Sequence, residues 1–294
     1  MRSTSKTVGY ARAVADSLFC ETKPPPTQSH FPINKFATWR TWSKSFRDFL
    51  RDAAPELQRP VTPPLRRVGG LDQYDRTYSW SSTYWTDENL RKRFTSFVRS
   101  LAATRPNREI ILLDGLISEN IDSRRLHTLF ALLRGVLVEL ADDERAAMYA
   151  PLGEIGARAG DFLLHADLYV PSILFNVFDQ VPRDGSGAST FLSVTSLRKL
   201  LRALPSLPAR KAKTILELFK QEPRVDRFDV LYDLLHGDHP WVPELERAME
   251  QRQLRIKLHR GQGYLLSDRA WLHGRDAPLG GVPANRVRRL VFGR

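Results

Sequence analysis

The heptapeptide Leu-Leu-His-Ala-Asp-Leu-Tyr occupies residues 163–169, within a short apolar segment that follows Gly160. Its length and apolar character favour a β-strand. Alternate side chains of a strand share one face, so His165 and Asp167 point to the same side, about 7 Å apart along the chain. Both side chains can therefore reach one cation.

A third ligand for such a cation would come from a distant strand, and His273 is the candidate. Two imidazoles and one carboxylate on one face of a metal suit iron(II) and leave three adjacent coordination positions open. Residues 236–238 repeat the His-x-Asp pattern, but Gly237 and the following His-Pro indicate a turn close in sequence to His273. His259 is an alternative third ligand without supporting signals in its surroundings.

The sequence around His273 resembles a known family of enzymes. Residues 263–275 read Gly-Tyr-Leu-Leu-Ser-Asp-Arg-Ala-Trp-Leu-His-Gly-Arg, and residues 286–292 read Arg-Val-Arg-Arg-Leu-Val-Phe. This order resembles the C-terminal part of the 2-oxoglutarate-dependent oxygenases of the taurine dioxygenase and clavaminate synthase-like superfamily. In those proteins a short strand ending near Asp-Asn-Arg leads to His-Gly-Arg, and an arginine follows.

A second segment, Gly-Ala-Ser-Thr at residues 187–190, resembles the Gly-Gly-x-Thr segment of the same superfamily. The chain departs from the family at two places, with Ala188 for the second glycine and Ser-Asp-Arg at 267–269 for Asp-Asn-Arg. The resemblance extends over residues 160–294 and is interrupted between 197 and 250. The N-terminal half resembles no family.

The resemblance implies an iron(II) site formed by His165, Asp167 and His273. It further implies that 2-oxoglutarate is a co-substrate whose distal carboxylate pairs with an arginine, because a planar guanidinium donates two parallel hydrogen bonds to a carboxylate. Arg289 is the favoured arginine. Arg288 would face the opposite side of the same strand, and Arg286 is a third choice. Thr190 is the candidate that helps to hold the co-substrate.

The implied fold is α+β, with a double-stranded β-helix (jelly-roll) core, N-terminal helices and a helical insertion. We expect a flexible arm at 1–30, a mostly helical part at 31–159 that packs on the core, and the oxygenase core at 160–294 with its insertion at about 197–250. The expected core strands are 162–169, 173–178, 190–194, 254–259, 264–266 and 287–292.

The N-terminal half has its own patterns. Aromatic residues recur every three or four positions from Phe36 to Phe49 among lysines and arginines, which predicts an amphipathic helix. The same composition could stack on bases of single-stranded nucleic acid. Helices are also expected over 89–103 and from an N-cap at Ser123 to Leu140, with a buried strand at 109–113 between them.

Composition limits the class of protein. The 294 residues carry a net charge of +12, which attracts anionic substrates, anionic membrane surfaces or nucleic acid. Cys20 is the single cysteine, which excludes an internal disulfide and a zinc site of several thiolates. No segment has the length and apolarity of a membrane span. We expect a cytoplasmic protein, with peripheral contact at the inner membrane surface as an additional expectation.

The sequence-level hypothesis is thus an iron(II)- and 2-oxoglutarate-dependent dioxygenase that releases succinate and CO2. Hydroxylation is expected, because family members that halogenate lack the carboxylate that Asp167 supplies, while desaturation and cyclisation stay open. The expected substrate is small or anionic: an amino acid derivative, a sugar or a lipid head group. Cations expected near it are Arg66, Arg67, Arg91, Arg93, Arg210 and Lys211. The alternative is a basic nucleic-acid-binding protein without catalysis.

Overall fold

Two β-sheets form the centre of the protein in the computed structural model. The structure describes residues 17–24, 36–59, 65–68, 71–74, 84–106, 109–118, 121–155, 162–168, 173–181, 187–221, 225–276 and 285–293. The larger sheet has seven strands in the order β1 (Phe19–Glu21), β2 (Ala37–Trp42), β5 (Ile110–Leu113), β11 (Gly263–Ser267), β8 (Ile173–Gln180), β13 (Asn285–Phe292) and β6 (Ala147–Ile155). The smaller sheet has the order β10 (Leu254–Ile256), β9 (Ser189–Ser193), β12 (Trp271–Arg275) and β7 (Phe162–His165). A separate pair joins β3 (Leu65–Val68) to β4 (Leu71–Tyr74).

From β6 onward the chain passes from one sheet to the other between consecutive strands, except from β9 to β10, which both lie in the smaller sheet. The strands β6, β8, β11 and β13 lie in the larger sheet, and β7, β9, β10 and β12 lie in the smaller one. Neighbouring strands among these eight pair in antiparallel fashion. Segments distant in sequence are therefore brought side by side, and β7 comes to lie next to β12.

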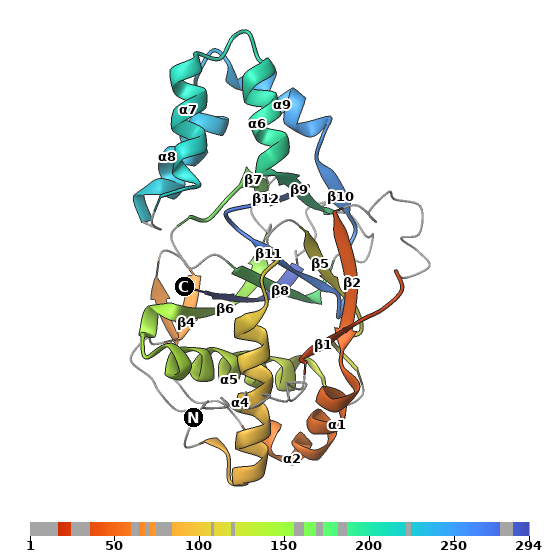
Figure 1. Ribbon diagram of the computed structural model, residues 1–294. Helices are drawn as coiled ribbons and strands as arrows, with labels where there is room; N and C mark the ends of the chain where they lie inside the picture. Colours follow the sequence, from red (N-terminus) through yellow and green to blue (C-terminus); the bar gives the residue numbers. More distant parts are fainter. Residues whose placement is uncertain are drawn as a thin grey trace, which may run out of the picture.

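Helices cover the outer face of each sheet (Figure 1). The larger sheet packs on α1 (Lys44–Asp52), α2 (Ala54–Leu57), α4 (Glu88–Ala103) and α5 (Ser123–Ala141), which a short 3-10 helix, η3 (Glu144–Ala146), follows. The smaller sheet packs on α6 (Val194–Ala203), α7 (Ala209–Leu218), α8 (Val225–His236) and α9 (Val242–Glu250). A third apolar cluster fills the space between the two sheets. The smaller sheet thus lies between this interior and the helical insertion.

The alternation of residues in β8 shows how the sequence specifies these layers. Phe175 and Val177 pack outward against the helices, whereas Leu174 and Phe178 belong to the cluster between the sheets. Asn176 shares the inward face and is 1% exposed. A polar side chain at an inward position needs buried hydrogen-bond partners, so it marks a polar region inside the core.

The predicted helix from Phe36 to Phe49 is wrong in its first half. Residues 37–42 form β2, which pairs in parallel with β5, and α1 begins only at Lys44 after the N-cap Ser43. Of the aromatic residues in this stretch, Phe36 is exposed and the others are buried in the core. Burial withdraws these rings from stacking on bases, so the observation behind the nucleic-acid alternative is explained by packing.

The structure adds detail to three other expectations for the N-terminal half. The arm at 1–30 lies partly outside the described residues, and within it Leu18 and Phe19 are buried and β1 pairs with β2. The part at 31–159 contains the helices α1, α2, α4 and α5, and it also supplies β2, β5 and β6 to the larger sheet. Asp122, not Ser123, caps α5, since its side chain accepts the Arg125 backbone N–H.

Several predicted elements are confirmed. These are the helices over 89–103 and 123–140, the strand over 109–113 and the helical insertion at about 197–250, which is observed as α6 to α9. Among the described residues, no helix is both long and apolar enough to cross a membrane.

Candidate metal centre

Three buried side chains converge at the end of β7. His165 is the last residue of β7, Asp167 follows it, and His273 lies in β12 as the register partner of His165. The His165 Nε2 is 3.5 Å from Asp167 Oδ1, and the His273 Nε2 is 4.0 Å from Asp167 Oδ2. One ligand atom from each residue lies within 4.8 Å of the other two. The pairing of β7 with β12 and the turn after β7 thus bring together the three predicted ligands.

The orientation of both imidazoles suits metal binding. The His165 Nδ1 donates to the Leu163 carbonyl oxygen at 2.8 Å, which leaves the Nε2 lone pair on the side of Asp167. Within the described residues, neither ring nitrogen of His273 makes a hydrogen bond, although its side chain is 3% exposed. A buried polar atom without a partner costs about 1–3 kcal/mol, and a bound cation would supply the partner. Two imidazoles with one carboxylate are a donor set that fits iron(II).

The electrostatics favour the protonation states that a metal requires. Burial by itself raises the pKa of Asp167, but Arg289, His165 and His273 together lower that pKa below its ordinary range. Burial, helped by His165 and Arg289, lowers the pKa of His273 well below its ordinary value. Asp167 is therefore ionised and His273 neutral at pH 7, as metal ligands must be.

Arg289 joins this centre and Arg288 does not. The Arg289 Nη1 donates to Asp167 Oδ2 at 3.2 Å, and its Nε donates to Asn176 Oδ1 at 3.3 Å. Arg288 faces the opposite side of β13, where its Nη2 donates to Asp179 Oδ2 at 2.7 Å. The side chain of Arg286 lies outside the described residues. The prediction that Arg288 and Arg289 face opposite sides is confirmed, and Arg288 is corrected as a co-substrate candidate because it lies outside the space between the sheets.

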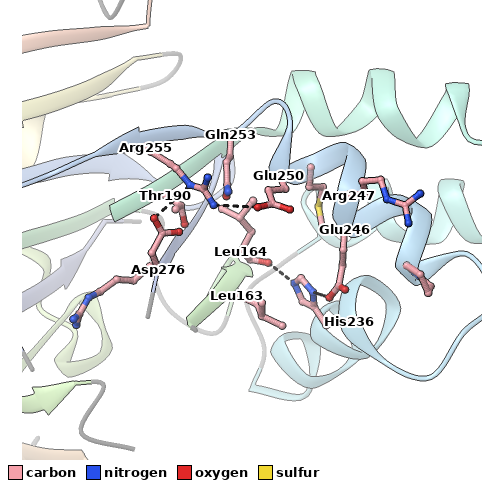
Figure 2. Close-up of a pocket in the computed structure, with 13 residues that line it drawn as sticks. Leu163, Leu164, Thr190, His236, Glu246, Arg247, Glu250, Gln253, Arg255 and Asp276 are labelled. Atoms are coloured by element: carbon pink, nitrogen blue, oxygen red, sulfur yellow. Dashed lines mark hydrogen bonds and ion pairs between the residues drawn. The ribbon is translucent and has the colours of Figure 1, made fainter. Parts of the chain in front are cut away.

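Thr190 is not brought to the ligands. Its neighbour Phe191 packs edge-on against Tyr264 between the sheets, with ring centroids 5.0 Å apart, so Thr190 faces the other side of β9. There it lines a cavity of about 410 Å³ with Leu164 and His236 (Figure 2). The assignment of Thr190 is corrected, because the alternation counted from Phe191 turns it away from His273.

The interior residue at this point of β9 is Ser189, which is 4% exposed and pairs in register with Arg275. Arg275 follows His273 by two residues and shares its face of β12. A hydroxyl and a guanidinium thus lie together one step deeper than His273. Counting alternate positions from His273 in the sequence could have found Arg275.

Two further residues near the ligands were missed from the sequence. The Asp268 carboxylate accepts the backbone N–H groups of Asp167 at 3.0 Å and Leu168 at 2.7 Å, and it is 2% exposed. Burial and the charge of Asp167 raise the pKa of Asp268 to about 7. Phe228 of α8 contacts the His165 ring edge-on, with centroids 5.6 Å apart. No sequence pattern signals that α8 lies over β7.

The second His-x-Asp pair stays outside the centre, as predicted. His236 ends α8, with its Nε2 2.8 Å from the Leu164 carbonyl oxygen and its Nδ1 2.8 Å from Glu246 Oε1 (Figure 2). Asp238 is exposed in the following turn, and His259 is exposed after β10. Neither residue lies in the three-residue group.

The cations expected near the substrate are dispersed. Arg91 and Arg93 form ion pairs with Glu88 and Asp52, and α4 lies on the far side of the larger sheet from β7 and β12 (Figure 1). Arg210 and Lys211 are exposed in the first turn of α7. The side chains of Arg66 and Arg67 lie outside the described residues. Arg91 and Arg93 are therefore corrected as substrate-binding candidates.

Comparisons with known proteins find structures of similar architecture but no match by sequence. No family model and no curated protein match the chain. An asparagine oxygenase in complex with Fe(II), 2S,3S-3-hydroxyasparagine and succinate is 13% identical, with a TM-score of 0.41 over 86% of this chain and 92% of that one. The non-heme iron oxygenase OrfP with Fe, succinate and (3R,4R)-dihydroxy-L-Arg is 11% identical, with a TM-score of 0.43 over 86% and 93%. A taurine dioxygenase from Burkholderia xenovorans is 12% identical, with a TM-score of 0.38 over 88% of each chain. These likenesses are distant, with identities of 11–13%.

Proposed function

We propose that the protein is an iron(II)- and 2-oxoglutarate-dependent dioxygenase. The observation that carries the proposal is the buried group of His165, Asp167 and His273, whose ligand atoms lie within 4.8 Å of one another. A facial set of two imidazoles and one carboxylate is the ligand set of non-haem iron(II) oxygenases. The sequence resemblance around His273 points independently to the same reaction.

The proposed core is a double-stranded β-helix of the eight strands β6 to β13. The repeated passage of the chain between two facing sheets supports it, because such a path folds a chain into a jelly roll with an enclosed interior. His165 and His273 come from β7 and β12 of the smaller sheet, and Asp167 follows β7. The paired strands would hold the two histidines in a fixed geometry, and the turn after β7 would hold Asp167.

Arg289 is the proposed partner of the 2-oxoglutarate distal carboxylate. Its side chain is largely buried, and its guanidinium contacts Asp167 and Asn176. Asn176 in turn donates to the Tyr264 hydroxyl at 2.6 Å, so the guanidinium is held within a polar network. Arg275 and Ser189 share this interior and form the second candidate pair for the same carboxylate.

Each residue of the site has a separate proposed role in the reaction. With iron(II) and 2-oxoglutarate bound, dioxygen would provide an oxidant that can hydroxylate an unactivated carbon, with release of succinate and CO2. His165 and His273 would present Nε2 to the metal, and Asp167 would supply the charge. Phe228 and the apolar residues between the sheets would exclude water from the reacting atoms.

The proposed substrate is a small molecule that carries negative charge. The net charge of +12 supports this choice, because a positive field attracts anions over long distances. The contact between Phe228 and His165 supports a substrate that approaches along α8, where the helical insertion borders the ligands. An amino acid derivative, a phosphorylated sugar and a lipid head group at an anionic membrane surface all fit this description, and hydroxylation is the expected outcome.

Anaerobic titration of the full-length protein with iron(II) and 2-oxoglutarate tests the function. We expect a weak visible charge-transfer band of the chelated complex and succinate formation when air is admitted. His273→Ala and Asp167→Ala should abolish both signals.

Matched controls use the two polar residues that the structure places elsewhere. His259→Ala and Asp238→Ala change the same residue types at exposed positions, and both should retain the band. A band that persists in His273→Ala, or its absence in the unaltered protein, would contradict the proposed function.

A further inference from the structure

We propose that Asp268 is the positioning residue that holds two metal ligands from different strands in register. Its contacts to Asp167, Leu168 and His273 carry the proposal. The proposal rests on the proposed metal centre. In this proposal Asp268 orients the metal ligands and does not itself bind the metal.

The first part of this role concerns the turn after β7. Leu168 has a φ of 50°, a left-handed conformation that is uncommon for a residue with a side chain. Such a conformation costs on the order of 1–3 kcal/mol and persists where the surroundings enforce it. The two Asp268 oxygens accept the N–H groups of Asp167 and Leu168, at 3.0 and 2.7 Å. The carboxylate therefore stabilises the turn that places the Asp167 side chain against the two histidines.

The second part concerns the ring of His273. The Asp268 Oδ1 lies 3.7 Å from His273 Nδ1, on the edge of the ring opposite the Nε2 that faces Asp167. A carboxylate beside Nδ1 favours the tautomer with the proton on Nδ1, which leaves the Nε2 lone pair for a metal. His165 obtains the same tautomer from the Leu163 carbonyl. His165 is thus oriented by a hydrogen bond, whereas His273 has the charge of a carboxylate 3.7 Å from its Nδ1.

An amide at this position could not perform both tasks. Asp268 lies in Ser-Asp-Arg, where the family that the sequence resembles has Asp-Asn-Arg. An asparagine has one acceptor oxygen and one NH2 group, so it can accept from only one of the two N–H groups at full strength. The other N–H, or the His273 Nδ1–H, would then face a donor. The aspartate is therefore a feature of this chain that couples the turn to the histidine.

The test is the affinity of the full-length protein for cobalt(II), whose visible absorption reports the ligand geometry. Asp268→Asn and Asp268→Ala are compared with the unaltered protein at a temperature where circular dichroism shows all of them folded. We expect Asp268→Asn to weaken cobalt(II) binding by about 10- to 100-fold, the usual effect of removing a hydrogen-bond partner of a metal ligand, and to shift the absorption bands. If Asp268→Ala does not fold, the cobalt(II) affinity of Asp268→Asn alone tests the proposal.

Asp179→Asn is the matched control. Asp179 is as buried as Asp268, at 3% against 2% exposure, but it pairs with Arg288 on the outer face of the larger sheet. We expect this variant to lower the melting temperature and to leave cobalt(II) affinity within about twofold of the unaltered protein.

Wild-type affinity and an unchanged spectrum in Asp268→Asn would overturn the proposal, as would an equal loss of affinity in Asp179→Asn. Failure of the proposed function looks different, because the unaltered protein and His273→Ala would then bind cobalt(II) equally well. The two failures can therefore be told apart in one titration series.

Discussion

Arg288 and Arg289 are adjacent in sequence, yet they enter two regions of opposite character. Arg288 lies on the outer face of β13 with Asp179, His127 and Tyr149, beneath α5. Arg289 lies on the inner face with Asp167, Asn176 and Tyr264. Both regions are buried polar clusters with one arginine–aspartate pair.

The two clusters differ in what their histidines do. In the outer cluster His127 Nδ1 lies 2.8 Å from the Tyr149 hydroxyl, a normal hydrogen bond. In the inner cluster both ring nitrogens of His273 lack a hydrogen-bond partner among the described residues. A buried histidine that has a hydrogen-bond partner stabilises the fold, whereas one whose two buried ring nitrogens lack a partner is suited to bind a ligand. We therefore expect changes in the outer cluster to affect stability and changes in the inner cluster to affect binding.

The largest expected effect is the loss of a ligand from the inner cluster. Asp167→Ala should reduce iron(II) affinity by more than about 100-fold, which exceeds the loss expected when a neighbour of a ligand is changed. Calorimetric titration under anaerobic conditions measures this affinity. Asp179→Ala in the outer cluster should bind iron(II) normally, and a similar loss of affinity in both variants would remove the distinction between the clusters.

The neighbouring arginines provide the next test. Arg289→Gln should raise the KM for 2-oxoglutarate by about 10- to 100-fold, because a charged hydrogen-bonded pair contributes about 1.5–3 kcal/mol. Arg288→Gln should instead lower the free energy of unfolding by about 3 kcal/mol, because it leaves Asp179 buried without its cation. Succinate assays and urea unfolding separate the two outcomes. A normal KM in Arg289→Gln combined with a raised KM in Arg275→Gln would transfer the co-substrate role to Arg275.

The outer cluster also predicts a pH dependence of stability. Burial, followed by the charge of Arg288, lowers the pKa of His127 from 6.5 to about 4. Because the unfolded chain binds this proton more tightly, the stabilisation is complete above pH 6.5, falls as the pH decreases and is lost below about pH 4. The loss amounts to at most about 3 kcal/mol. Urea unfolding of the unaltered protein and of His127→Phe at several pH values measures the contribution of His127. The variant should lack this part of the pH dependence.

The smallest expected effects distinguish the two faces of β9. Ser189→Ala should raise the KM for 2-oxoglutarate about fivefold, as expected for one neutral hydrogen bond of about 1 kcal/mol. Thr190→Val, a change of the neighbouring buried residue, should leave that KM unchanged. A raised KM in Thr190→Val with a normal KM in Ser189→Ala would indicate that Thr190 binds the co-substrate, and it would contradict the orientation of β9.

Much of the site could be predicted because it depends on short-range geometry. The period of two in a strand separates Arg288 from Arg289, and this relation holds in the structure. His165 and Asp167 also lie together, but β7 ends at His165, so the turn after the strand and not the predicted alternation directs Asp167. The assignment of Thr190 to the co-substrate was wrong because it rested on a sequence motif. A motif does not indicate which face of the strand points to the interior. Phe191, packed on Tyr264, supplies that answer.

The sequence alone therefore determined the ligand types, the opposite faces of Arg288 and Arg289 and the basic character of the protein, because residue identity and local periodicity suffice for these. Only the tertiary structure decided that β2 replaces the first half of a predicted helix, that Asp268 lies near both Asp167 and His273, and that Phe228 of α8 contacts His165. These relations join residues far apart in the chain. They depend on which strands pair and which faces are enclosed, and no local pattern of residues carries that information.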